Sequence, residues 1–169
     1  MRKVSGQPIV IWSDAAGTKD LGAFYINKSE PDARQLTSKI WTRNQPKPSS
    51  AFSITLHRSM MRVNEYINTK KMRADEQPFL HWGVEWKGKR VICHVDNQAV
   101  FHVLENRTIR GASMELLRRC LLLAAEYDIE IEVRWIPTKE NALADMLSRF
   151  HLDKITNLAP QLTYPTCSY

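Results

Sequence analysis

The sequence contains no run of about 18 apolar residues, the length that a helix needs to cross a bilayer. Its first residues, MRKVSGQP, also lack the apolar core of a signal peptide. We therefore expect a cytoplasmic or nuclear protein that is not secreted and has no membrane partner. With 169 residues, of which 43% are hydrophobic and 25% charged, the chain has the size and composition of one globular domain.

Cysteine and glycine are both scarce. The three cysteines, Cys93, Cys120 and Cys167, are odd in number and form no C-x-x-C pair, which argues against a disulfide framework or a zinc site. Cys93 and Cys120 lie in apolar runs and are predicted core residues. The six glycines form no phosphate-binding loop, and the sequence has no internal repeat.

Acidic residues are fewer than basic ones. The sequence has 24 lysines and arginines but 18 aspartates and glutamates, for a net charge of +6. Such a balance suits a polyanionic partner such as nucleic acid, although many basic proteins bind none. Arg107 and Arg110, in a glycine-containing loop, are candidate contacts. Arg118 and Arg119 are equally well explained as the solvated face of a helix.

The hydrophobic pattern predicts the order β-β-β-α-β-α-α-β-α, which indicates a single α/β domain with a mixed sheet. We assign this domain to residues 8–150 and a C-terminal tail to 151–169. Residues 27–50 are predicted to be a surface loop, and 58–64 fit no element. The expected strands are 9–12, 21–26, 52–56, 90–95 and 129–136, and the expected helices are 69–82, 97–104, 114–127 and 140–150.

Three aspartates fall where chemistry collects in open α/β sheets, near strand ends. Asp14 follows the first strand, Asp96 ends the strand at 90–95, and Asp145 lies in the first turns of the last helix. Clustered carboxylates repel one another unless cations balance them, and Mg²⁺ prefers such oxygen ligands. Two ions about 3.5–4 Å apart can activate a water and stabilise a leaving oxygen. Alternatively, each aspartate is only a turn or capping residue.

Four stretches match a known family: WSDAAG at 12–17, INTKKMRA at 67–74, WGVEWKGKRVICHVDNQAV at 82–100 and WIPTKENALADMLSR at 135–149. In this order and spacing, they resemble the ribonuclease H domain of reverse transcriptases from long-terminal-repeat and DIRS-like retrotransposons, especially fungal ones. The resemblance covers residues 8–162.

The resemblance implies an RNase H-like α/β fold, with a mixed five-stranded sheet flanked by helices. It implies hydrolysis of the RNA strand of an RNA–DNA hybrid with two Mg²⁺ (or Mn²⁺) ions, within a larger reverse transcriptase polyprotein. The implied catalytic and metal-binding residues are Asp14, Asp96 and Asp145. The implied substrate-binding residues are Asn97, Asn141, Arg107 and Arg110, and Asn141 also matches a position that shapes the site.

The sequence departs from the family at Lys71, which stands where a catalytic glutamate is expected. An ammonium cannot ligate Mg²⁺, so cleavage should be reduced or lost. Asp75 faces the same side of the helix and is an alternative carboxylate. Pro78 should weaken the helix, and changes bunched at 57–78 suggest a decaying element copy.

A second departure is Trp135, at a place where many relatives carry a histidine that assists product release. Three functions remain open: an active hybrid ribonuclease, an impaired domain that still binds nucleic acid, and a structural or protein-interaction domain. Binding to nucleic acid should weaken steeply with salt, whereas a purely structural domain should show no such affinity.

Overall fold

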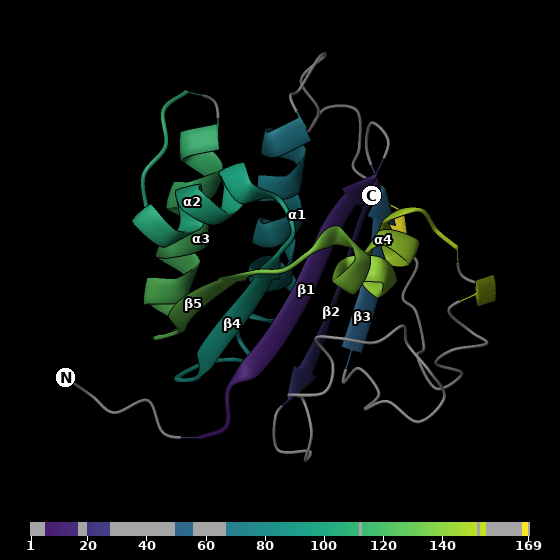
Figure 1. The fold of residues 1–169 in the computed structure, drawn as a ribbon. Helices are drawn as coiled ribbons and strands as arrows, with labels where there is room; N and C mark the ends of the chain where they lie inside the picture. The colour runs from purple at the N-terminus through teal and green to yellow at the C-terminus, as the bar shows by residue number, and fades with distance from the viewer. Residues whose placement is uncertain are drawn as a thin grey trace.

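The computed structural model describes residues 6–16, 20–27, 50–55, 67–111, 113–151, 153–154 and 167–168. Within these ranges one mixed sheet has the strand order β5-β4-β1-β2-β3-β6 (Figure 1). Its strands are β1 (Ile9–Ala16), β2 (Asp20–Asn27), β3 (Ser50–Thr55), β4 (Arg90–Val95), β5 (Glu130–Trp135) and β6 (Cys167–Ser168). The helices are α1 (Ile67–Trp82), α2 (Gln98–Asn106), α3 (Ser113–Glu126) and α4 (Ala142–Ser148), with a 3₁₀ turn, η3 (Thr138–Asn141), before the last.

The predicted element order and the α/β class with a mixed sheet are confirmed. The strands β1, β2 and β3 are antiparallel neighbours, whereas β4 is parallel to both β1 and β5. The described sheet has six strands rather than the expected five, because Cys167–Ser168, in the predicted tail, pairs with β3. Residues 28–49 of the predicted loop and the unassigned residues 58–64 lie outside the described ranges.

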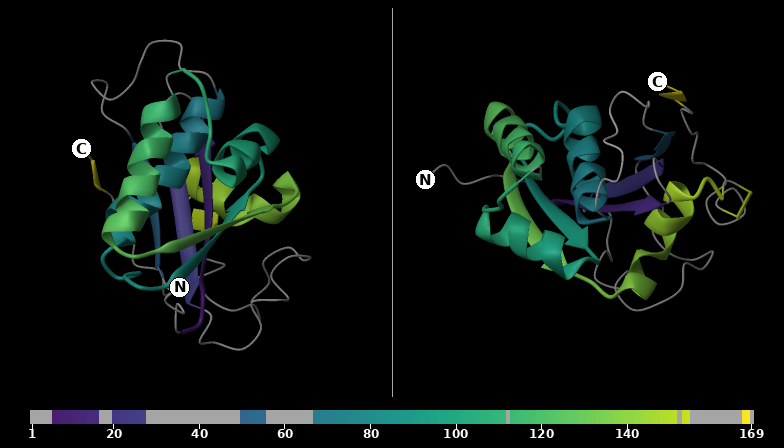
Figure 2. Two further views of the ribbon diagram at one scale, coloured as in Figure 1. Left: turned by 90° about the vertical axis from the view of Figure 1, so that its left-hand side faces the viewer. Right: turned by 90° about the horizontal axis from the view of Figure 1, so that it is seen from above.

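The sheet is covered on both faces, with α1 and α3 on one side and α4 on the other (Figure 2). Every residue of β1 is accordingly buried. Ile11 and its neighbours on one face pack with α1 and α3, while Trp12 on the other face packs with α4 and stacks on Phe24. No helix in the described part of the chain is long and apolar enough to cross a membrane.

The first hairpin is longer than predicted. Asp14 was expected just after the first strand, but it lies inside β1 and pairs in register with Gly22 of β2. The small and polar residues that follow Trp12 carry no hydrophobic signal, and pairing with β2 is what extends the strand. Gly22 also gives α4 room, because a Cβ there would lie 2.3 Å from the backbone nitrogen of Ser148. The close approach brings α4, with Asp145, against the hairpin.

The helix α1 forms over Ile67–Trp82 and contains Pro78. Asp75 and Glu76, expected to disturb an apolar face, are indeed buried, with exposed fractions of 4% and 1%. Both acids have partners on neighbouring elements, described below. Cys93 and Cys120 are buried free thiols, as predicted.

Candidate active site

The side chain of Lys71 lies between two of the predicted catalytic aspartates. Its Nζ is 3.1 Å from Asp14 Oδ1 and 2.8 Å from Asp96 Oδ1. The two carboxylates are almost fully buried, and the lysine side chain is 19% exposed. Asp14 comes from β1, Asp96 follows the neighbouring β4, and Lys71 lies near the start of α1. We call this end of the sheet the site end.

Burial and charge act against each other in this group. Burial raises the pKa of Asp14; the Lys71 ammonium lowers it and the Asp96 carboxylate raises it again, with a net increase. For Lys71, burial alone would lower the pKa. The hydrogen bond to Asp96 and the attraction of both carboxylates outweigh burial, and the pKa of Lys71 is raised. The lysine is therefore held in its charged form at neutral pH.

Asp75 lies one helical turn beyond Lys71 and faces the core. Its carboxylate accepts a short hydrogen bond from Ser13 Oγ in β1. Burial raises the pKa of Asp75 to about 7, although the hydrogen bond from Ser13 opposes the increase. The carboxylate therefore supports β1 from within the core, and we do not assign it the role of a replacement for the missing glutamate.

Glu76 is the second buried acid of α1. Arg119 of α3 holds it with two contacts, Nε to Oε1 at 2.6 Å and Nη2 to Oε2 at 3.3 Å. Burial raises the pKa of Glu76, and Arg119 lowers it. Such a two-point pair joins α1 to α3. Both acids that suggested damage in the sequence thus have a partner, a hydroxyl for Asp75 and a guanidinium for Glu76, which weakens the interpretation of this helix as decayed.

Asn141 and Asp145 lie next to the site end but differ in exposure. Asn141 is 1% exposed, and its Nδ2 donates a hydrogen bond of 3.0 Å to the backbone oxygen of Ser13, beside Asp14. This contact positions β1, in agreement with a shaping role, and leaves the residue too buried to touch substrate directly. Asp145 instead accepts a hydrogen bond of 2.8 Å from Arg149, one turn later in the chain.

Asn97 caps α2: its Oδ1 accepts from the backbone nitrogen of Val100 at 3.0 Å. Its Nδ2 donates to Asn68 Oδ1 at 3.0 Å, which ties α2 to the start of α1. The residue is half-buried beside Asp96, so a contact with a ligand at the site end remains geometrically open.

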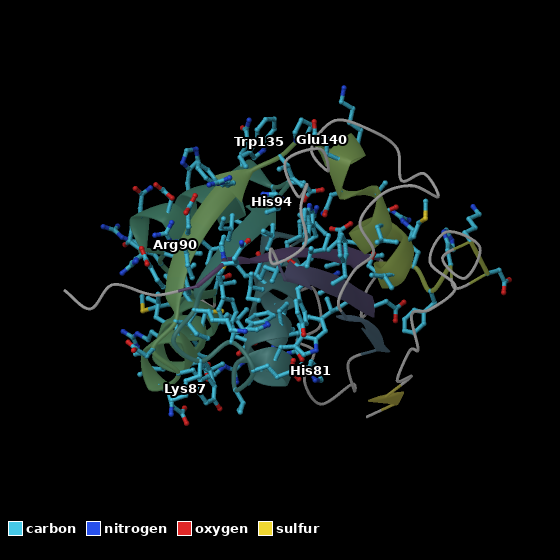
Figure 3. The ribbon with its side chains drawn as sticks, turned by 90° about the horizontal axis from the view of Figure 1, so that it is seen from below. His81, Lys87, Arg90, His94, Trp135 and Glu140 are labelled. Carbon is cyan, nitrogen blue, oxygen red and sulfur yellow. The ribbon has the colours of Figure 1, made fainter. Side chains whose placement is uncertain are left out.

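The basic candidates Arg107 and Arg110 are both exposed, in the connection between α2 and α3. This connection reaches the site end, because Ser113 at the start of α3 hydrogen-bonds Thr69 at 2.8 Å, two residues before Lys71. Trp135 lies at the same end. It pairs in register with Val95 and is 45% exposed, and Figure 3 shows it near Glu140.

The residues present do not fit the pair of divalent ions that the resemblance implies. The Oδ1 atoms of Asp14 and Asp96 face an ammonium, which has three protons and no lone pair to offer a metal. Three buried oxygens of these residues, Asp14 Oδ1, Asp96 Oδ2 and Asn141 Oδ1, have no hydrogen-bond partner among the described residues, although Asp14 Oδ1 lies at ion-pair distance from Lys71. Within those ranges, no three Asp, Glu, His or Cys side chains are grouped as a metal ion would require. The expected convergence of three aspartates is thus only partly realised, because Asp145 is not grouped with the other two.

Sequence reasoning missed three partners at this end: Ser13, Arg119 and Arg149. The pair between Asp145 and Arg149 carried a local signal, because opposite charges four residues apart on a helix face each other. No local pattern in the sequence indicates the partners of Asp75 and Glu76, because these partners come from a strand and a helix that are distant in the chain.

No protein-family model matches this sequence, and no curated protein matches it. Solved structures do share its fold. The N-terminal RNase H domain of a Mycobacterium tuberculosis protein is 14% identical with a TM-score of 0.62, over 90% of this chain and 98% of that one. LC11 RNase H1 from compost, solved with an RNA/DNA hybrid, is 13% identical with a TM-score of 0.59, over 88% and 97%.

A third similar structure is a foamy viral protease–reverse transcriptase in complex with an RNA/DNA hybrid. It is 12% identical with a TM-score of 0.52, over 89% of this chain and 20% of the viral one. At these identities the likeness establishes the fold, which is RNase H-like.

Proposed function

We propose that this chain is the RNase H-like domain of a retroelement reverse transcriptase polyprotein, that it binds RNA–DNA hybrids in the cytoplasm or nucleus, and that its cleavage of the RNA strand is reduced or lost. The observation that carries the proposal is the position of the Lys71 ammonium between Asp14 and Asp96. The lysine contacts both carboxylates through oxygens that would otherwise be available to bind a metal ion.

Hybrid binding is supported by the fold, by charge and by the placement of basic residues. Two structures of the same fold were solved with an RNA/DNA hybrid. The chain carries a net charge of +6, and Arg107 and Arg110 are exposed in a connection that reaches the site end. Hybrids are recognised mainly through backbone shape and 2′-hydroxyls, so little base preference is expected. The retroelement origin rests on the sequence resemblance, in particular the motifs at 82–100 and 135–149.

Among the residues that the structure describes, neither Lys71 nor Asp75 substitutes for the missing glutamate. Lys71 is held protonated by two carboxylates and cannot accept a proton from water. Asp75 is buried and already accepts a hydrogen bond from Ser13. Asp14 and Asp96 are neutralised in part by the lysine, so neither acts as a free ligand. Binding without efficient hydrolysis is the behaviour that this arrangement supports.

The decisive experiment is cleavage of a labelled RNA–DNA hybrid by the wild type and by Lys71→Glu, in Mg²⁺ and in Mn²⁺. Hybrid binding is measured in parallel by fluorescence anisotropy over a salt series. We expect the wild type to bind with an affinity that falls steeply with salt, and to cleave slowly or not at all. Lys71→Glu should cleave faster by on the order of 10²-fold, because it restores an oxygen ligand.

Other outcomes separate the alternatives. Rapid cleavage by the wild type, lost in Asp96→Asn, would make the chain a working ribonuclease. Absence of any salt-dependent affinity would leave the structural or protein-interaction domain as the better description. A revertant that is folded yet inert would show that other changes in the chain, besides Lys71, block the reaction.

A further inference from the structure

Lys71 has a role of its own, beyond the loss of a glutamate. We infer that its ammonium is a permanent internal counter-charge for Asp14 and Asp96. The site end therefore folds and remains stable without a divalent ion. The three residues form a closed ion triad that joins β1, β4 and α1. The inference stands on these ion pairs and on the contacts around them, and it does not require that the chain bind nucleic acid.

The first argument is electrostatic. The side chains of Asp14 and Asp96 are 7% and 3% exposed, and each has an oxygen within 3.1 Å of the same Nζ. Two carboxylates this close and this buried repel one another strongly, because water screens them poorly. A cation between them removes the repulsion, and the chain supplies that cation covalently. Divalent ions balance such carboxylates only while they are bound.

The second argument is that Lys71 is held in place by its surroundings. Thr69, two residues earlier, is tied to Ser113 of α3 by a buried hydrogen bond of 2.8 Å. Asn68 accepts a hydrogen bond of 3.0 Å from Asn97, the residue after Asp96. The start of α1 is thus joined to both α2 and α3. These contacts hold the Lys71 ammonium between Asp14 and Asp96. A surface lysine with a free side chain has no such support.

The third argument is that the two acids in the next turn of α1 have other partners and make no direct contact with the Lys71 ammonium. The carboxylate of Asp75 is hydrogen-bonded to Ser13. The carboxylate of Glu76 is paired with Arg119. The direct contacts of the Lys71 ammonium are therefore made with Asp14 and Asp96, while its charge acts on Asp75 only from a distance.

The test is thermal unfolding in EDTA and over a series of Mg²⁺ and Mn²⁺ concentrations. The melting temperature of the wild type should be the same in all of them. Lys71→Met should melt lower in EDTA by on the order of 10 °C, since removing one partner of a buried pair leaves uncompensated charge. Added Mg²⁺ should restore part of this loss, because a ligand of the folded state stabilises it by mass action. Lys71→Glu should depend on divalent ions more strongly still.

Lys87→Met is the matched control, because it removes the same charge from the turn that precedes β4, at the opposite end of that strand from Asp96. Lys87 is exposed, and Figure 3 shows it far from Trp135 and Glu140. Its melting temperature should stay close to that of the wild type and should not respond to Mg²⁺.

Two results of the unfolding experiment would overturn the inference. One is a wild type that is stabilised by Mg²⁺ as much as Lys71→Glu. The other is Lys71→Met that equals the wild type in EDTA. If Lys71→Glu does not fold, titration of the wild type with Mn²⁺, followed by electron paramagnetic resonance, still decides: saturable binding that is lost in Asp96→Asn contradicts the closed triad. None of these measurements involves nucleic acid, so they can fail or succeed independently of hybrid binding.

Discussion

Ser13 of β1 donates a hydrogen bond to the buried carboxylate of Asp75 in α1, one helical turn beyond Lys71. The contact fastens the helix to the central strand beside Asp14, and Asn141 holds the same strand from the other side through the Ser13 carbonyl. The site end is therefore built from polar contacts that connect each catalytic candidate to a structural neighbour.

Asp75 should make stability depend on pH. Burial raises its pKa to about 7 from 3.8, so between about pH 4 and 7 the folded chain keeps a proton that the unfolded chain has released. Stability should therefore fall as the pH rises through this window, by on the order of 4 kcal/mol. In Asp75→Asn the amide oxygen can still accept a hydrogen bond from the Ser13 hydroxyl. The free energy of unfolding of this variant should depend less on pH, as measured by urea unfolding at several pH values. Parallel curves for the variant and the wild type would contradict this; the exposed Asp128→Asn is the control.

The ion pair between Glu76 and Arg119 should stabilise the fold, because the carboxylate of Glu76 is buried. Arg119→Met removes the two-point partner of a carboxylate that is 1% exposed and leaves Arg73 as its nearby cation, and should cost about 3 kcal/mol at neutral pH. Replacing both residues with apolar ones should recover much of the loss. Urea unfolding measures all three variants. Arg118→Met, its exposed neighbour, should have little effect, and an equal loss there would mean that burial of Glu76 is not the cause.

Trp135 is a candidate contact for nucleic acid, since it is 45% exposed at the site end. Stacking of a base on an aromatic ring contributes about 1–3 kcal/mol, so Trp135→Ala should weaken hybrid binding by about 5- to 150-fold. Leu122→Ala removes an apolar side chain of α3 that is more exposed than Trp135, at 68%, and should leave affinity unchanged. Fluorescence anisotropy with a labelled hybrid compares the two, and equal affinities would exclude Trp135 from the interface.

Asp96→Asn should abolish any residual cleavage of a hybrid. The side chain is 3% exposed and contacts Lys71, and its Oδ2 has no hydrogen-bond partner among the described residues, so any metal ion that enters the site in a fraction of the molecules would need this carboxylate. The assay is a long incubation with labelled hybrid in Mn²⁺. Cleavage that survives the substitution would point to a contaminating nuclease or a different site.

Local patterns in the sequence were enough to predict the element order, the α/β class and the nearness of Asp14 and Asp96. Hydrophobic periodicity is a local property, and parallel strands end at the same edge of a sheet, so both predictions follow without knowing which residues touch. The same approach underestimated β1, because the residues after Trp12 are held in the strand by pairing with β2.

The sequence by itself determined the order of the elements and the presence of Lys71, Asp75 and Glu76 in one helix; the resemblance predicted an acid at position 71 and small or apolar residues at 75 and 76. Only the tertiary structure decided what those residues do. Ser13 is 62 positions from Asp75, and Arg119 is 43 positions from Glu76, so no local pattern could pair them. What was interpreted from the sequence as damage is, in the folded chain, two buried acids with partners: Ser13 donates a hydrogen bond to Asp75, and Arg119 pairs with Glu76.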